Sequence, residues 1–231
     1  MALPEFLACH SHFSWDEFVE CIQEASPHEP VLVTGGAMGA DTAAVKAQLA
    51  HNRMSLIMGA SGVEVNEWNS FSQTGRVRLL RMSLGELEDK FADCLAETCQ
   101  ELKRHQTSNP YTRKLLLRNM AIANVVEQLF AFVEELQLDA FDSSTNNLGV
   151  PGGTAYACQR FAIRHRGDAI PLYLFENKSG CWYQPVDTEW RKIAEYGETP
   201  PVPKGVFGVV GTRQFSPSMS KALEALMDVQ E

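Results

Sequence analysis

The chain lacks the features that would place it in a membrane or in an oxidising compartment. No apolar run approaches the roughly 20 residues that a membrane-spanning helix needs. Residues 1–5 contain neither a basic nor an apolar leader segment, so we expect no signal peptide. The six cysteines include no C-x-x-C pair, which predicts reduced thiols and no tightly bound metal. We therefore predict a cytoplasmic protein with no membrane contact.

Positive charge is also scarce. The 20 Lys and Arg residues are outnumbered by 29 Asp and Glu residues, which gives a formal net charge of −9. Proteins that neutralise nucleic-acid phosphates need a basic face, so this balance argues against a nucleic-acid partner. At 231 residues and 45% hydrophobic content, the chain can form one α/β domain, or one domain with a small addition.

The most informative stretch that is present is a short apolar strand, residues 31–33, which leads into a glycine-rich turn and a helix of small residues over 42–50. Such a junction directs backbone N–H groups and a helix N-terminus at one spot, which attracts phosphate. Glycine also lets the backbone approach a ligand closely. The alternative is a tight turn with close helix packing. The candidate ligand-binding residues are Gly35, Gly36, Ala37, Met38 and Gly39.

A second junction of the same kind lies at residues 149–157, where Pro151-Gly152-Gly153-Thr154 opens a helix. Two such loops in one domain indicate a ligand with a phosphate and a further group to hold, such as a nucleotide. Gly152, Gly153 and Thr154 are therefore candidates for a second anion or sugar contact. In the alternative interpretation, Thr154 only caps the helix.

Strands and helices alternate between and around these loops. The run at 129–133 is continuously apolar, as in a central parallel strand. The pattern predicts an α/β fold with a doubly wound parallel sheet, Rossmann-like and three-layered. The expected strands are residues 5–9, 31–33, 53–58, 77–80, 129–133 and 170–175. The expected helices are residues 14–25, 42–50, 83–105, 113–124 and 154–166.

The proline-rich segment 200–203 predicts a linker between a nucleotide-binding domain over residues 1–199 and a C-terminal βα unit over 200–231. Within that unit, residues 208–216 resemble residues 6–14, since each run is a strand followed by a loop that ends in Phe-Ser. Many βα units look alike, so the likeness is open to a plain interpretation. Otherwise the first unit is repeated, and its strand either extends the same sheet or begins an incomplete second copy.

Four further side chains are candidates for ligand contact or catalysis. Arg118 and Asn119 precede the central strand and are expected to contact a phosphate or base; the alternative is a surface salt bridge and helix capping. Glu134 follows that strand directly, and Asp41 lies in the first turn after the first glycine loop. Either carboxylate can serve in acid–base catalysis. The alternatives are a solvated carboxylate at Glu134 and a helix-dipole contact at Asp41.

Other residues have two interpretations each. Cys158 lies one turn into a helix, where it is either an activated thiol or a buried inert one. His10 and His12 follow the first expected strand and either face the site or have no role in it. Trp182 and Tyr183 follow the last expected strand, where they either stack on a base or pack in a satellite core.

The two glycine loops and the Arg118-Asn119 pair, in this order, resemble the Rossmann-like superfamily that links DNA-processing protein A with the Lonely-guy phosphoribohydrolases, the SLOG superfamily. The G-G-A-x-G-A-D pattern of residues 35–41 is most similar to the YspA/YpsA-type nucleotide-binding proteins. The resemblance covers roughly residues 31–175. It implies a nucleotide or nucleotide-derived ligand, for instance a phosphate-bearing pterin, at the carboxyl edge of the sheet, and a homo-oligomer.

The chain departs from that superfamily in two places. Lonely-guy enzymes carry a catalytic glutamate on the helix after the P-G-G loop, whereas residues 154–159 here contain no acid. The helix expected over 83–105 is an insertion that we interpret as a lid or an oligomer contact. We therefore predict a nucleotide sensor or carrier; the alternative is a hydrolase that cuts an N-glycosidic or phosphate bond with Glu134 or Asp41 and Arg118. Single-stranded DNA binding is a third option, which the net charge disfavours.

Overall fold

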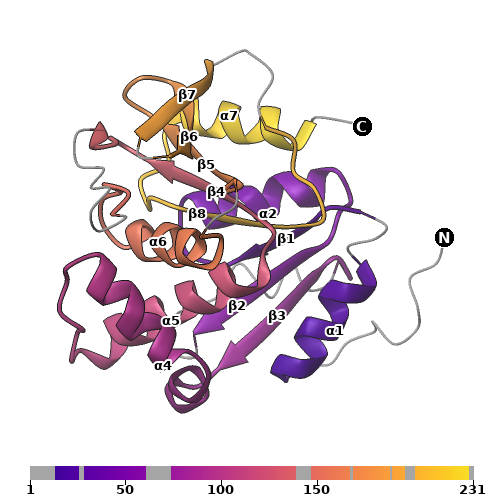
Figure 1. Ribbon diagram of the computed structural model, residues 1–231. Coiled ribbons are helices and arrows are strands. Elements are labelled where there is room, and N and C mark those ends of the chain that lie inside the picture. The colour runs from indigo at the N-terminus through magenta and orange to yellow at the C-terminus, as the bar shows by residue number, and fades with distance from the viewer. Residues whose placement is uncertain are drawn as a thin grey trace.

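The structure is a computed structural model that describes residues 14–25, 29–60, 74–138, 147–166, 169–187, 189–195 and 201–228. The strand expected over residues 5–9, with His10 and His12, lies outside these residues. The fold is α/β with one mostly parallel sheet, as the alternation of strands and helices predicts (Figure 1). No helix of the described segments is long and apolar enough to cross a membrane.

Eight strands form the sheet, in the order β3-β2-β1-β8-β4-β5-β6-β7. The strands are β1 (Val31–Thr34), β2 (Ser55–Ala60), β3 (Val77–Met82), β4 (Gln128–Val133), β5 (Leu172–Glu176), β6 (Cys181–Val186), β7 (Glu189–Glu195) and β8 (Val206–Gly211). Neighbouring strands from β3 to β5 pair in parallel, while β6 and β7 are antiparallel. The helices are α1 (Trp15–Ala25), α2 (Ala40–Ala50), α4 (Leu84–Glu101), α5 (Pro110–Val125), α6 (Thr154–Arg164) and α7 (Pro217–Asp228).

Helix starts follow local signals in the sequence. The Ser83 side chain accepts a hydrogen bond from the Glu86 backbone N–H, and the Glu86 carboxylate accepts one from the Ser83 N–H, so α4 begins with a capping box. Ser14 and Glu17 form the same reciprocal pair at the start of α1, which agrees with the helix expected over residues 14–25. Asn109 caps α5 through the Thr112 N–H. These caps fix where the helices enter the core.

The C-terminal strand β8 lies in the middle of the sheet. It pairs in parallel with β1 on one side and with β4 on the other, with Gly208 opposite both Val33 and Leu129. The strand of the C-terminal βα unit therefore belongs to the same sheet as the rest of the chain. If β8 is counted as the first strand, then β2, β1, β8, β4 and β5 follow the Rossmann order 3-2-1-4-5.

Apolar side chains cover both faces of the sheet. Val31 and Val33 pack in one core cluster, whereas Leu32 between them packs in another, because successive strand residues point to opposite faces. The first cluster includes residues of α1, α4, α5 and α6, and the second includes residues of α2 and α7. Figure 1 shows α4, α5 and α6 grouped together, away from α2 and α7.

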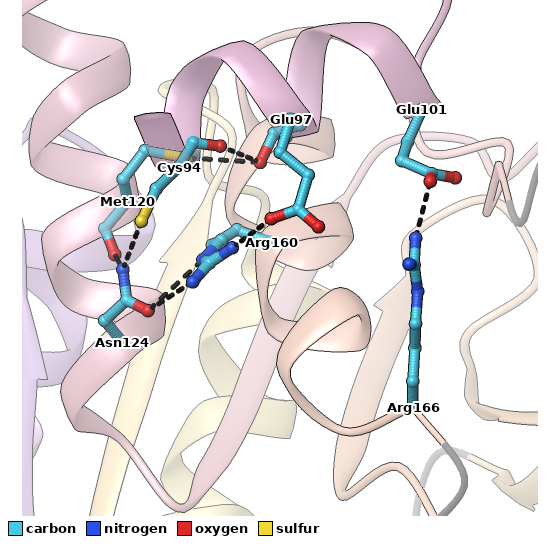
Figure 2. A network of polar contacts seen from close by, with 8 residues as sticks. Cys94, Glu97, Glu101, Met120, Asn124, Arg160 and Arg166 are labelled. Atoms are coloured by element: carbon cyan, nitrogen blue, oxygen red, sulfur yellow. Dashed lines mark hydrogen bonds and ion pairs between the residues drawn. The ribbon is translucent and has the colours of Figure 1, made fainter. Parts of the chain in front are cut away.

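Helix α4, which we interpreted as a lid or an oligomer contact, packs against α5 and α6 (Figure 2). Arg160 of α6 donates from Nη1 to the Glu97 carboxylate at 2.8 Å and from Nη2 to the Asn124 side-chain oxygen at 3.0 Å. Arg166 pairs with Glu101 at 2.5 Å. Exposed ion pairs contribute little, so the buried apolar face of α4 is its main anchor. No described residue of α4 lines the cavity described below.

The antiparallel hairpin of β6 and β7 extends the sheet beyond the last predicted strand. Trp182 is 2% exposed and packs against the rings of Phe130, Phe132 and Phe175, with centroid separations of 6.1, 5.5 and 5.3 Å. Tyr183 is also buried. The core interpretation of these two aromatic residues is therefore confirmed.

The central position of β8 makes its side chains critical for stability. Phe207 is fully buried, so Phe207→Ala is expected to lower the free energy of unfolding by about 3–5 kcal/mol in urea titrations. The control is Ile193→Ala on the edge strand β7, where the side chain is 38% exposed and the expected change is about 0.5 kcal/mol. Equal effects of the two substitutions would contradict the central placement of β8.

Candidate functional site

A cavity of about 1070 Å³ opens at the carboxyl ends of β1, β4 and β8. This volume is at the upper limit of the roughly 300–1,000 Å³ that small-molecule sites occupy. Its walls come from the first glycine loop, α5, the second glycine loop, and the loop between β8 and α7. All predicted site residues except Gly35 line it, which brings both glycine loops to one place. Open α/β sheets bind ligands at this edge, where the strand order switches.

Gly35 does not line the cavity itself but leaves room for Arg118, which does. A Cβ atom at this position would lie 2.5 Å from Cζ of Arg118, so only glycine leaves space for the guanidinium. Arg118 Nη1 donates a hydrogen bond of 2.9 Å to the Gly35 carbonyl oxygen. The absence of a side chain at Gly35 therefore serves Arg118, and through it the cavity.

Gly39 is required by close packing of the C-terminal loop. Its φ is +90°, and a Cβ atom would lie 2.3 Å from the Thr212 carbonyl oxygen and 2.7 Å from Cα of Arg213. The Ala40 N–H also donates to the Thr212 oxygen, at 3.2 Å. A tight turn at this glycine agrees with the alternative interpretation, but the close packing that it allows is against the β8–α7 loop and not against a helix.

Asp41 holds the first glycine loop together. Its side chain is 5% exposed, and Oδ2 accepts a hydrogen bond of 3.0 Å from the Ala37 N–H. Burial raises the pKa of Asp41, while the charge of Arg118 and the hydrogen bond from Ala37 act in the opposite direction. The protonated form is thus more favoured here than in water.

Arg118 lies in the middle of α5 and is 7% exposed, so its interpretation as a surface salt bridge is wrong. Burial lowers its pKa, and nearby Asp41 raises it. Among the described residues, the buried Nε has no hydrogen-bond partner, although buried donors in proteins are nearly always paired. This nitrogen lies against Gly35, and the arginine as a whole lines the cavity next to the first glycine loop.

The second glycine loop is held through its carbonyl groups. Arg104 Nη1 donates to the Gly152 oxygen at 3.0 Å, and Asn119 Nδ2 donates to the Gly153 oxygen at 3.2 Å. A Cβ atom at either glycine would meet nothing within 4 Å, so the loop faces open space. Helix α6 begins at Thr154 with Gly153 at the N-cap and no side-chain cap, so the interpretation of Thr154 as the cap is wrong.

Glu134 lies exposed at the end of β4 and lines the cavity. Its two carboxylate oxygens accept hydrogen bonds from Asn177 Nδ2 at 2.9 and 3.0 Å. The Asn177 side-chain oxygen accepts in turn from the hydroxyls of Ser216 and Ser218 at the start of α7. The carboxylate is therefore oriented through contacts with the C-terminal unit.

The sequence analysis missed several residues that line the cavity, among them Lys46, Tyr111, Arg213 and Phe215. Arg213 could have been found, because the unit at 208–216 is another strand–loop–helix junction. Arg104 had no such signal, since no local pattern connects it to Gly152.

Two further interpretations concern thiols and metals. Cys158 is fully buried, and burial raises its pKa to about 12, so the activated-thiol interpretation is wrong. Within the described segments, no group of three or more His, Cys, Asp or Glu side chains could hold a metal ion.

The raised pKa of Asp41 predicts a pH-dependent stability. Because the folded state holds this proton more tightly than the unfolded chain, the Asp41 contribution to stability falls as pH rises from 3.8 through the folded pKa. Asp41→Asn should remove this pH-dependent contribution to stability, while its amide oxygen can still accept a hydrogen bond from the Ala37 N–H. Urea titrations over a pH series should then show the variant gaining stability relative to wild type as pH rises. A difference in stability between variant and wild type that stays constant with pH would contradict the raised pKa of Asp41.

Comparison with known proteins leaves the site to be interpreted from its own residues. No protein-family model, curated protein or solved structure matches the chain.

Proposed function

We propose that this protein binds a nucleotide or nucleotide-derived ligand in the cavity between the two glycine loops, as a sensor or carrier. The observation that carries this proposal is the position of Arg118, a buried arginine that lies against Gly35 of the first glycine loop and lines the cavity. A buried positive charge is costly unless an anion or hydrogen-bond acceptors pair with it. A phosphate oxygen is a suitable acceptor, because arginine recognises phosphate through charge-assisted hydrogen bonds.

Two helix N-termini add to this preference for an anion. Helices α2 and α6 each have 11 residues and begin at the cavity with a glycine at the N-cap and no side-chain cap. Their helix dipoles favour negative charge. In α2 the N–H groups of Ala40 and Thr42 already donate to the carbonyl oxygens of Thr212 and Ala37, so the dipole is its main contribution.

Apolar side chains at the cavity suit a planar ring. Met38 and Tyr111 are 79% and 52% exposed, more than any other large hydrophobic side chain in the described part of the chain, and both line the cavity. Exposed apolar groups at a concave site are typical of ligand contacts. A nucleotide combines the phosphate and the ring that such a lining would bind.

The arrangement of the helices supports the same ligand class. Apolar packing on both faces of the sheet fits the doubly wound, three-layer architecture that the resemblance to the SLOG superfamily implies. We extend the proposal to membership of that superfamily, on the basis of the two glycine loops and Arg118-Asn119 in one cavity.

A matched pair of glycine substitutions tests ligand binding. Gly153→Ala places a methyl group in open space at the cavity, whereas Gly85→Ala places one in open space on α4, away from it. Neither glycine has a positive φ, so each variant is expected to keep its stability or gain up to about 1 kcal/mol. Calorimetry with the common nucleotides should show affinity reduced about tenfold or more in Gly153→Ala alone. Unchanged affinity in both variants would contradict the proposed cradle.

Hydrolysis of the bound nucleotide is a second candidate function, and it is based on Glu134. This carboxylate lines the cavity and is oriented by Asn177, as an acid–base group needs to be. Asp41 is the other carboxylate of the cavity, and its hydrogen bond to Ala37 gives it a role within the loop.

If the protein is a hydrolase, Glu134→Gln should reduce turnover by about 100-fold or more, because the variant has no titratable group at this position. Its glutamine oxygen can still accept from Asn177, so nucleotide affinity should change little. Chromatography of nucleotide products would measure turnover, and calorimetry would measure binding. Wild-type turnover that persists unchanged in the variant would exclude Glu134 from the chemistry.

A further inference from the structure

Two arginines flank the first glycine loop from different elements. Arg118 comes from α5 and lies against Gly35, where Nη1 bonds the carbonyl oxygen. Arg213 follows β8, and its backbone lies against Gly39 at the other end of the loop. Both arginines line the cavity. The loop residues 36–38 therefore lie between two guanidinium-bearing positions that are 95 residues apart in the sequence.

Neither arginine forms an ion pair in the part of the chain that the structure describes. Other arginines do: Arg76, Arg113, Arg160, Arg166 and Arg191 each pair with a glutamate. Burial has the largest effect and lowers the pKa of Arg118, Asp41 and Tyr111 raise it, and the positive charge of Arg213 lowers it by the smallest amount of these. Two like charges in one cavity repel each other, and an anion bound between them would remove this cost.

The other charged groups of the cavity are already engaged. The buried Asp41 carboxylate accepts from the Ala37 N–H, and Glu134 is held by Asn177. The balance near the first glycine loop therefore favours a ligand group with more than one negative charge.

We propose that Arg118 and Arg213 together bind one terminal phosphate of the ligand, and that Arg213 selects a phosphomonoester over a phosphodiester. This inference rests on the proposed function, since it concerns the same cavity. A phosphomonoester carries a charge of about −1.5 to −2 at neutral pH and offers three acceptor oxygens. A diester carries a single charge and has fewer free oxygens, so it can use only part of a pair of arginines.

The test compares ligands and variants of the full chain by calorimetry. The ligands are the four nucleoside 5′-monophosphates, their 5′-methyl phosphodiesters, and inorganic phosphate. The variant is Arg213→Gln, and the matched control is Lys221→Gln, which removes the same charge from an exposed site on α7 outside the cavity. Arg213 is exposed, so its substitution is expected to leave the fold intact.

Wild type should bind at least one monophosphate about tenfold or more tightly than its methyl ester. Arg213→Gln should weaken monophosphate binding by about 10- to 100-fold and remove most of the preference over the ester. Lys221→Gln should match wild type, and Arg213→Lys should regain part of the affinity.

Four outcomes would overturn the role of Arg213, the nucleotide assignment, or both. Equal monophosphate affinity in wild type and Arg213→Gln, or equal affinity for monophosphate and ester in wild type, would overturn the role of Arg213 and leave the proposed function standing. Binding of inorganic phosphate as tight as that of any nucleotide, lost in Arg213→Gln, would support the arginine pair and overturn the nucleotide assignment. No binding of any probe to wild type would overturn both.

Discussion

The insertion of β8 between β1 and β4 is the contact on which the rest of the molecule depends. Strands β1 and β4 each pair with β8, so this C-terminal strand joins β3-β2-β1 to β4-β5-β6-β7. Gly208 leaves room for the Leu129 side chain of the neighbouring strand, because a Cβ atom there would lie 2.9 Å from its Cδ1. The two parts of the sheet are thus held together by a segment close to the end of the chain.

The same insertion completes the cavity. Where β8 ends, its loop places the Thr212 carbonyl against Gly39 and Ala40, and places Arg213 at the first glycine loop. Helix α7 follows, and its first turn orients Glu134 through Asn177. Formation of the central sheet and assembly of the candidate site are therefore the same structural event, although the residues involved lie far apart in the sequence.

The two glycine loops contribute in different ways. In the first loop, Gly35 and Gly39 make space for Arg118 and for the C-terminal loop, so their small size serves packing within the protein. In the second, Gly152 and Gly153 face open space while Arg104 and Asn119 hold their carbonyl groups. The second loop therefore offers exposed backbone, and the first offers the arginines that it positions.

Local features of this fold were predictable from the sequence, and non-local ones were not. Apolar periodicity predicted α4, and the second glycine loop predicted the start of α6, because these signals depend on residues within a few turns. Charge and spacing singled out Arg118 but did not reveal its burial, which depends on Gly35, 83 residues earlier. The hairpin of β6 and β7 was not predicted, because aromatic residues such as Trp182 and Tyr183 occur both in buried cores and at binding surfaces. The position of β8 depends on strand pairing between distant segments, which no local pattern encodes.

Hydrogen exchange on the full chain, with and without millimolar nucleoside 5′-monophosphates, is the most direct test of a single site built from three loops. The account predicts slower exchange of backbone amides in residues 35–42, 152–156 and 211–215 together with the same nucleotide, because these segments line one cavity. Protection of one segment without the others, or protection only elsewhere in the chain, would contradict it.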